Sequence, residues 1–368
     1  MKTMNAHKKL GSLLSKAGTN LSLILALLVM SVLFAIMSPH FLTLRNLVNI
    51  ATYTSINAIM AFGITVAMIL AAMDLSQYTV AAVSGMVMAL MLRAGLPTGV
   101  AIVCALLTGV LLGLLNGVLV SICGVNPIIA TLGTQQIYRG FAYLVSNGKN
   151  ILISNDFLTF IGRGDILGVP VVVLLMIVMF AITAYVLKYT SFGRKIYAIG
   201  GNKNASYLSG INIRRVQMGG FVYCSVAGAL GGILLASQVG VALPTCGIGS
   251  DMDVIASVVL GGVRLSGGCG KAAGTLLGAL ILRGSINSIR RQLQEVAKEM
   301  DEAAAEAFRR EEIEWIKKRD LAADKAGTKS TGTPAQSIEY VRTSASVTMD
   351  RCYELLENYG DYLESDKN

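Results

Sequence analysis

The sequence has 368 residues, of which 54% are apolar and 14% are charged, and its formal net charge is +9. Soluble globular domains carry about 25% charged residues, so these figures exclude an ordinary soluble enzyme. Residues 1–282 hold 17 basic and 5 acidic side chains, whereas the remainder holds 14 basic and 17 acidic ones. We therefore expect an all-α, polytopic transmembrane helix bundle over residues 1–282, followed by a soluble or surface helical tail.

Apolar runs of membrane-spanning length recur along the first part of the chain. A helix needs about 20 mostly apolar residues to cross the hydrocarbon core of a bilayer. Such runs predict seven spanning helices, near residues 21–37, 56–73, 77–92, 98–122, 127–146, 168–187 and 216–238. Pro127 is well placed to open the fifth of them. Two further apolar pieces, 254–263 and 272–282, are too short to cross a bilayer comfortably by themselves.

Basic residues gather in two short segments that predict the orientation. The N-terminus carries Lys2, Lys8, Lys9 and Lys16 before any acidic residue, and the loop 188–215 carries six basic residues and no acidic one. Basic loop residues favour the cytoplasmic side of a membrane. An N-terminus in the cytoplasm followed by seven spans places both segments there. The positive charge thus orients spans in membrane lipid, and we expect no nucleic-acid partner.

Asp74 is the only acidic residue before residue 156, and it stands between two apolar runs. An ionisable side chain inside a membrane is costly, which makes it a candidate for function. The structural alternative is a capping box, in which Asp74 caps the third predicted helix and Gln77 completes the pair. A cap could also fix the geometry of a permeation path. We therefore regard Asp74 and the nearby Ser76 as candidates for the substrate path.

Polar side chains within the fourth and fifth predicted spans are further candidates for that path. Asn116 and Thr131 could hydrogen-bond a polyhydroxylated solute, but such side chains equally serve to join membrane helices to one another. Arg139 lies toward the outer half of the fifth span, where a long basic side chain can snorkel to the interface. The run of small residues at 227–232 predicts close helix packing.

The loop 191–213 combines basic residues with glycine punctuation. It predicts a short helix between glycine-rich turns, with Asn202 or Asn204 as N-cap and Gly210 just past its C-terminus. A short helix pinned between two spans would be a docking element for a cytoplasmic partner. The simpler alternative, a solvated positive loop, explains the charge but not the glycine pattern.

Motifs for catalysis or cofactor binding do not emerge from the sequence. Residues 267–271 look superficially like a phosphate loop, but that motif would require glycine at 265 and serine or threonine at 272, where the chain has Leu265 and Ala272. The two histidines, His7 and His40, are too few and too far apart for a metal centre. We expect a transport subunit without cofactors, not an enzyme, so any energy for pumping comes from another polypeptide.

The segment 193–211 closely resembles the permease subunits of ATP-binding-cassette importers for ribose, galactose and related monosaccharides. That family shows a stretch like GR-x-x-YAIGGN, followed by an alanine-containing turn and LSGI. Further blocks match in order at residues 74–76, 115–117, 127–140 and 253–275. The resemblance covers about residues 15–282, and its motifs are specific for the family but not for one sugar.

The resemblance implies a permease of the bacterial inner membrane that works as a homodimer or beside a related permease. It also implies a separate cytoplasmic ATPase subunit docked on the loop 188–215, and an extracytoplasmic sugar-binding protein. By analogy, the helix that couples to the ATPase contains Asn204, Ala205, Ser206 and Gly210. The alternatives are a truncated or fused, non-transporting relic that acts as a membrane-tethered interaction protein, and a proton-coupled carrier that relies on Asp74.

The sequence departs from the family in two places. Tyr78 stands where the family commonly has a small residue. After Leu282 the family continues with roughly one and a half further spans, whereas this chain becomes charged. The tail predicts an amphipathic helix over 283–325, a linker over 326–337 and a second amphipathic helix over 338–368.

Overall fold

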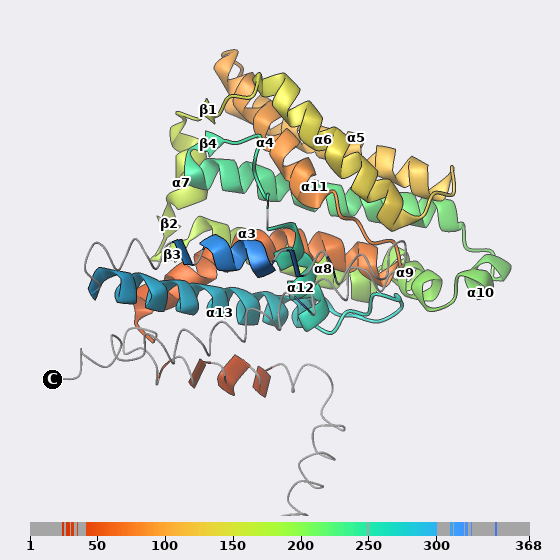
Figure 1. Cartoon of the computed structure of the whole chain (residues 1–368). Coiled ribbons are helices and arrows are strands. Elements are labelled where there is room, and N and C mark those ends of the chain that lie inside the picture. Colours follow the sequence, from red (N-terminus) through yellow and green to blue (C-terminus); the bar gives the residue numbers. More distant parts are fainter. Residues whose placement is uncertain are drawn as a thin grey trace, which may run out of the picture. The chain divides into compact units, whose positions relative to one another are not determined.

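Four long apolar helices and several shorter ones make up the part of the chain that the computed structural model describes (Figure 1). The described residues are 24–25, 27–29, 31–32, 35, 42–248, 250–299, 310–311, 313–319, 321–322, 325 and 343. Residues 42–283 belong to one compact unit, and a second unit begins again at Gly284. Of the first predicted span, 21–37, eight residues are described, and all eight are helical. The linker 326–337 and all but one residue of the second tail helix fall outside the described residues.

The described elements confirm an all-α helix bundle. In chain order they are α3 (Leu44–Ile69), α4 (Gln77–Arg93), α5 (Thr98–Ser121), α6 (Pro127–Ser146), β1 (Ile151–Leu152), α7 (Asp156–Arg163), β2 (Asp165–Ile166), β3 (Val169–Pro170), α8 (Val171–Tyr189), α9 (Ser191–Gly201), α10 (Lys203–Leu208), α11 (Ile213–Val239), β4 (Val241–Ala242), α12 (Asp251–Leu260) and α13 (Ala272–Glu299). Among these, α3, α5, α8 and α11 are long and apolar enough to cross a membrane.

The predicted helix boundaries are confirmed where local capping signals set them. Helix α6 begins at Pro127, with the side chain of Asn126 accepting a hydrogen bond from the Ile128 amide at 3.0 Å. Helix α3 instead begins at Leu44, well before the predicted residue 56. Its first turns contain polar residues that lower the hydropathy, yet a helix satisfies its own backbone hydrogen bonds wherever it runs.

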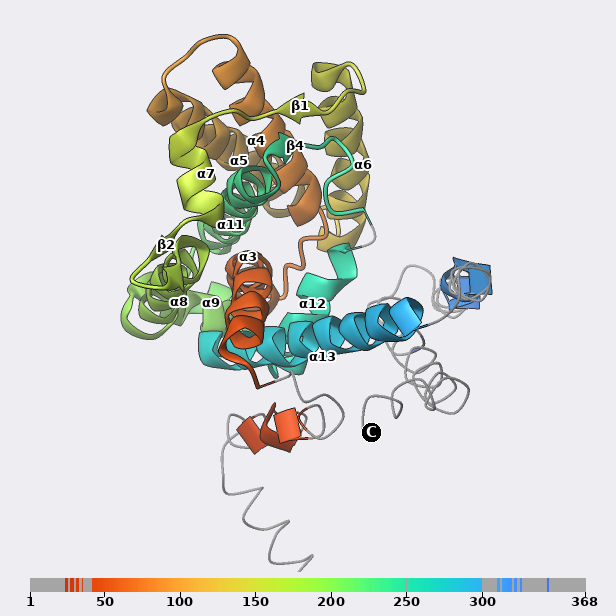
Figure 2. The ribbon, with the colours of Figure 1, turned by 90° about the vertical axis from the view of Figure 1, so that its left-hand side faces the viewer.

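Helix α11 lies at the centre of the unit, in contact with α3, α4, α5 and α7 (Figure 2). The small residues predicted to allow close packing do so: a Cβ at Gly232 would overlap the Ala81 carbonyl of α4. Where α11 faces α5, Gly109 of α5 lies against Ser225 and Ala229 of α11. Close backbone approach of this kind holds membrane helices together through van der Waals packing.

The two ends of α11 are built differently (Figure 1). Beyond its C-terminus, β4 pairs antiparallel with β1, with Ile151 opposite Ala242. There Arg163 of α7 caps α11, donating from Nε to the Gln238 carbonyl and from Nη2 to the Val239 carbonyl, both at 2.6 Å. The N-terminus of α11 follows α9 and α10, so the strand pair and the α9–α10 segment lie at opposite ends of the central helix.

Helices α12 and α13 complete the unit beside α3. The Thr65 hydroxyl of α3 lies 2.7 Å from the Thr275 hydroxyl of α13, and Arg283 forms an ion pair with Asp253 of α12 at 3.4 Å. Helix α13 is continuous through residue 283. The apolar piece predicted at 272–282 and the start of the charged segment predicted from 283 therefore form one helix.

Candidate functional site

The segment between α3 and α4 is non-helical and buried. Residues 72–76 adopt no regular secondary structure, yet all of them are buried within the bundle. Irregular backbone is tolerated inside a membrane protein only where protein or a water-filled cavity surrounds it. This segment contains Asp74 and Ser76, which makes it the first place to look for function.

Asp74 and Ser76 begin a chain of hydrogen bonds that runs from this segment to α5 and α6. The Oδ1 atom of Asp74 accepts from the Ser76 amide at 2.9 Å and from the Ser76 hydroxyl at 2.7 Å. The Asn116 amide of α5 donates to the same hydroxyl at 2.8 Å, and the Tyr138 hydroxyl of α6 lies 3.1 Å from Asn116 Oδ1. The structure thus brings Asp74, Ser76 and Asn116 together and adds Tyr138, which the sequence did not single out.

The capping-box interpretation of this segment is wrong. Ser76, not Asp74, is the N-cap of α4, and Gln77 is its first helical residue. The Gln77 side-chain amide points away from the cap and donates to the Met60 carbonyl of α3 at 2.7 Å and to the Cys224 carbonyl of α11 at 3.3 Å. The pattern failed because it describes neighbours in sequence, whereas the acceptors of the Gln77 amide lie on two other helices.

Thr131 is fully buried and lies close to the same segment. Its hydroxyl donates mainly to the Pro127 carbonyl of its own helix at 2.8 Å, and it lies 3.5 Å from the Met73 carbonyl. Asp74 Oδ2 and Gln77 Oε1 have no hydrogen-bond partner among the described residues. Buried acceptors without partners are rare in native proteins, so these two oxygens set the segment apart from the rest of the described packing.

Tyr78 is accommodated rather than disruptive. Its ring packs against Gly247, where a Cβ would overlap it, and its hydroxyl donates to Asn57 Oδ1 of α3 at 2.8 Å. The large Tyr78 ring therefore fits because the residue opposite it, Gly247, has no side chain.

The Arg139 side chain is held by backbone carbonyls of the segment after β4. Its Nη1 atom donates to the carbonyls of Pro244 and Cys246, each at 2.7 Å. It therefore fastens the segment after β4 to α6, because these backbone carbonyls have a charged donor within reach.

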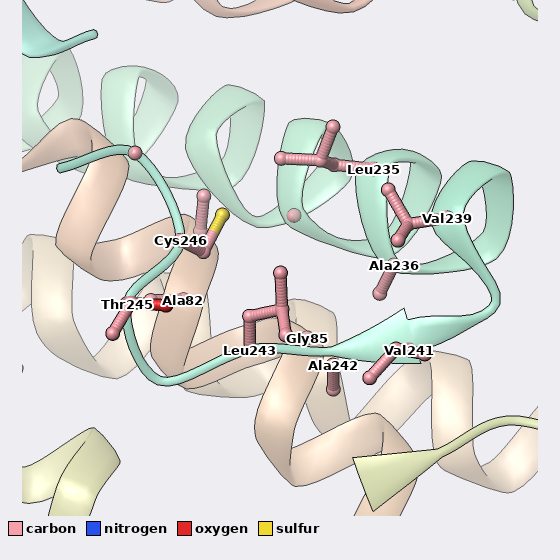
Figure 3. A pocket seen from close by; sticks show the side chains of 13 residues that line it. Ala82, Gly85, Leu235, Ala236, Val239, Val241, Ala242, Leu243, Thr245 and Cys246 are labelled. Atoms are coloured by element: carbon pink, nitrogen blue, oxygen red, sulfur yellow. The ribbon is translucent and has the colours of Figure 1, made fainter. Parts of the chain in front are cut away.

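A cavity of about 250 Å³ lies between this segment, α4 and α11. Figure 3 shows its lining, with Cys246 near one end of the segment and Val241 near the other. Almost all of the lining side chains are apolar. A sugar site needs convergent hydrogen-bonding groups, so this cavity does not have the chemistry of one.

The role of Arg139 in holding the segment after β4 against α6 is testable through the reactivity of the Cys246 thiol. Hydrogen bonds from charged donors contribute about 1.5–3 kcal/mol each, and ~1.4 kcal/mol changes an equilibrium constant tenfold. In a variant that keeps only Cys246 of the six cysteines, we expect Arg139→Gln to raise the rate of maleimide labelling at least tenfold. Arg93→Gln, at an exposed arginine ending α4, serves as control. Equal labelling rates in both variants would contradict the fastening role.

The loop 188–215 contains two helices in place of the one predicted. Asn202 separates them and caps α10, its Oδ1 accepting from the Ala205 amide at 2.9 Å, which confirms one of the two predicted caps. Gly210 follows the end of α10 with φ +76°, as a helix-terminating glycine should. Asn204, Ala205 and Gly210 are exposed, whereas Ser206 is buried and its hydroxyl donates to the Asn202 carbonyl.

The most exposed apolar side chains of this loop were missed from the sequence. Tyr207 is 71% exposed and Leu208 is 85% exposed, both at the end of α10. Single exposed apolar residues are ordinary on a protein surface. A large aromatic and a leucine together, on a capped helix outside the apolar spans, are the composition of a contact surface. Their signal in the sequence was an apolar pair just before Gly210, at the end of the short helix predicted there.

The other end of this loop segment is anchored in the bundle. The Tyr197 hydroxyl of α9 donates to the Gly270 carbonyl at 2.7 Å. Burial, and to a lesser extent the neighbouring Cys269, raises the pKa of the Tyr197 phenol, so it stays a donor at physiological pH.

Within the described part of the chain, no three His, Cys, Asp or Glu side chains lie close enough to hold a metal ion.

Comparisons with known proteins place these features in a family. The model of a family described as a branched-chain amino acid transport system permease component matches residues 46–308. The ribose import permease protein of Haemophilus influenzae is 39% identical over 262 residues, which cover 70% of this chain and 81% of the relative.

Two other relatives carry the names of different sugars. The D-allose transport system permease protein of Escherichia coli is 35% identical over 72% of this chain and 81% of its own length. The L-arabinose transporter permease protein of Azospirillum brasilense is 33% identical over 69% of this chain and 76% of its own length. No solved structure matches the chain.

Proposed function

The chain belongs to the family of branched-chain amino acid transport system permease components, and we propose that it is the membrane-spanning permease subunit of an ATP-binding-cassette importer for a monosaccharide. The relatives named above support the sugar class: they are named for ribose, D-allose and L-arabinose. The family description names amino acids, so leucine is the informative competing substrate.

The single observation that carries this proposal beyond the family is the geometry of α10. This helix is capped at both ends and presents Tyr207 and Leu208 to solvent at the end of the bundle remote from the β1–β4 pair. Aromatic side chains such as tyrosine are enriched among the residues that dominate binding energy in protein interfaces, and a leucine beside one adds apolar area to bury. We assign this surface as the docking site of the ATPase subunit. With this assignment, the loop 188–215 and the N-terminus lie in the cytoplasm of a bacterium and the strand pair lies outside.

The remaining assignments follow from the same architecture. An extracytoplasmic binding protein would deliver the sugar at the β1–β4 end, and a second permease subunit would complete the path. Asp74, Ser76, Asn116 and Thr131 are each fully buried. We assign them to the wall of the path as a brace that holds the irregular segment in place, rather than as a tight sugar site.

Proteoliposomes test the function directly. The chain is reconstituted with the ATPase and binding protein of its source bacterium, and uptake of radiolabelled ribose, allose, arabinose and leucine is measured with and without ATP. We expect ATP-dependent uptake of one of the sugars and none of leucine. ATPase binding without any uptake would support the non-transporting relic, and uptake driven by a proton gradient without ATP would support the secondary carrier.

The docking surface is tested with a pair of leucines. Burying a leucine side chain contributes about 1.5–3 kcal/mol, so we expect Leu208→Asp to weaken ATPase binding roughly tenfold to a hundredfold. The control is Leu167→Asp in the β2–β3 turn, where the leucine is 100% exposed at a site far along the chain from α10. Binding is measured by surface plasmon resonance on permease in nanodiscs. Equal affinities for the two variants would remove α10 from the interface.

A further inference from the structure

Three segments that are distant in the sequence meet backbone to backbone at the C-terminal end of α3. They are the C-terminus of α3 at Ile69, the end of α9 at Gly200, and the turn before α13 at Gly268. The Gly268 amide donates to the Ile69 carbonyl at 2.8 Å. A Cβ at Gly200 would overlap that same carbonyl and come within 2.5 Å of the Gly268 amide nitrogen. An alanine at position 200 is accommodated only if the backbone of a neighbouring segment shifts, because the neighbouring atoms belong to backbone and cannot rotate away.

Helix α9 connects this junction rigidly to α10. At its start, Gly193 packs against the last carbonyls of α8, where a Cβ would overlap those of Val186 and Leu187. At its end, the Asn202 amide donates to the Ala198 carbonyl at 3.0 Å, and the same Asn202 caps α10. Asn202 thus ends α9 and begins α10, so a displacement of α10 is passed on to α9.

The junction also leads directly into the buried irregular segment. Ala71 follows the end of α3 with φ 54°, an uncommon conformation for a residue other than glycine. The Ala72 amide turns back to the Ala67 carbonyl at 2.9 Å. From there the chain runs straight to Asp74, whose hydrogen bonds reach α5 and α6.

We propose that Gly200 is a positioning residue for coupling: the Ile69–Gly200–Gly268 junction transmits displacement of α10 to the segment 72–76 and so to the Asp74 network. This inference rests on the proposed function, since it requires an ATPase at α10. The physical basis is contact without an intervening side chain. Atoms already at van der Waals distance pass on a displacement that a rotatable side chain would absorb.

Two adjacent glycines provide the test. Gly200→Ala adds one methyl group at the junction, whereas at Gly201 the same methyl group would meet no atom within 4 Å. ATPase affinity, basal ATP hydrolysis, stimulation of hydrolysis by sugar-loaded binding protein, and sugar uptake are measured for both variants. We expect Gly200→Ala to keep ATPase affinity and basal hydrolysis within twofold of wild type while stimulation and uptake fall at least tenfold. Gly201→Ala should match wild type throughout.

A second variant keeps the proposal testable if Gly200→Ala does not fold. Tyr197→Phe removes only the hydroxyl that donates to Gly270 and adds no atom, and we expect it to lower the number of sugars imported per ATP severalfold without changing ATPase affinity. Normal coupling in a folded Gly200→Ala variant, or in Tyr197→Phe when the first is unfolded, would overturn the junction's role. If the wild-type chain itself did not bind the ATPase, the proposed function would be refuted instead.

Discussion

Asp74→Ala should destabilise the bundle and abolish uptake. The substitution removes the acceptor for both the amide and the hydroxyl of Ser76, in a segment where Asp74 and Ser76 are fully buried. A buried donor left without a partner costs about 1–3 kcal/mol, so two such donors give a loss of roughly 3 kcal/mol or more. The free energy of unfolding is measured by denaturant titration in detergent, beside uptake in proteoliposomes.

Asp74→Asn is the matched control, because its side-chain oxygen can still accept both hydrogen bonds from Ser76. We expect it to lie within about 1 kcal/mol of wild type and to retain most of the uptake, as a brace requires. A stable Asn variant without uptake would show that the negative charge itself takes part in transport. An Asn variant as unstable as the Ala variant would refute the brace.

Gly232→Ala should separate α11 from α4. A Cβ at this position would overlap the carbonyl group of Ala81, and the added methyl group would force one helix backbone away from the other. Overpacking of a close contact costs typically 1–3 kcal/mol, and here the obstructing atoms are backbone, so we expect about 3 kcal/mol. The thermal unfolding midpoint in detergent reports the loss.

Gly133→Ala provides the comparison within another apolar helix. Gly133 of α6 is exposed, and a Cβ there would meet nothing within 4 Å. Alanine is the better helix former by about 1 kcal/mol, so this variant should be as stable as wild type or slightly more so. If both substitutions lowered the unfolding midpoint equally, the cause would be glycine itself and not the α4–α11 contact.

Local signals in the sequence predicted much of the helix arrangement. The predicted range 77–92 and helix α4 differ by one residue at their C-terminal ends, and Pro127 marks the start of α6. The start of α6 depends on Asn126 and Pro127, which are next to it in the chain. Helix α7 was not predicted, although Asn155 caps it by accepting from the Leu158 amide at 3.1 Å. Its eight residues lie in a stretch of mixed charge, where no apolar run indicates a helix.

The candidate site was predictable in its members but not in its connections. Asp74 stood out because acidic residues are rare in the first part of the chain. Its network extends to Asn116 and Tyr138, and Gln77 binds a carbonyl 147 residues away. Periodicity and capping patterns describe neighbours in sequence, so they cannot specify contacts that form only after several helices have packed. For the same reason the local capping-box pattern was misleading.

The central place of α11 also bears on how the protein is made. Helices α3, α4 and α5 leave the ribosome before Ile213–Val239, the helix against which all three pack. Until it arrives, the Gln77 side-chain amide has only the Met60 carbonyl of its two acceptors, and the faces of α3, α4 and α5 that pack on α11 lack their partner. The early helices therefore form a stable core only once most of the unit has been synthesised. Chains that stop before residue 213 should be degraded by membrane proteases rather than accumulate as a smaller bundle.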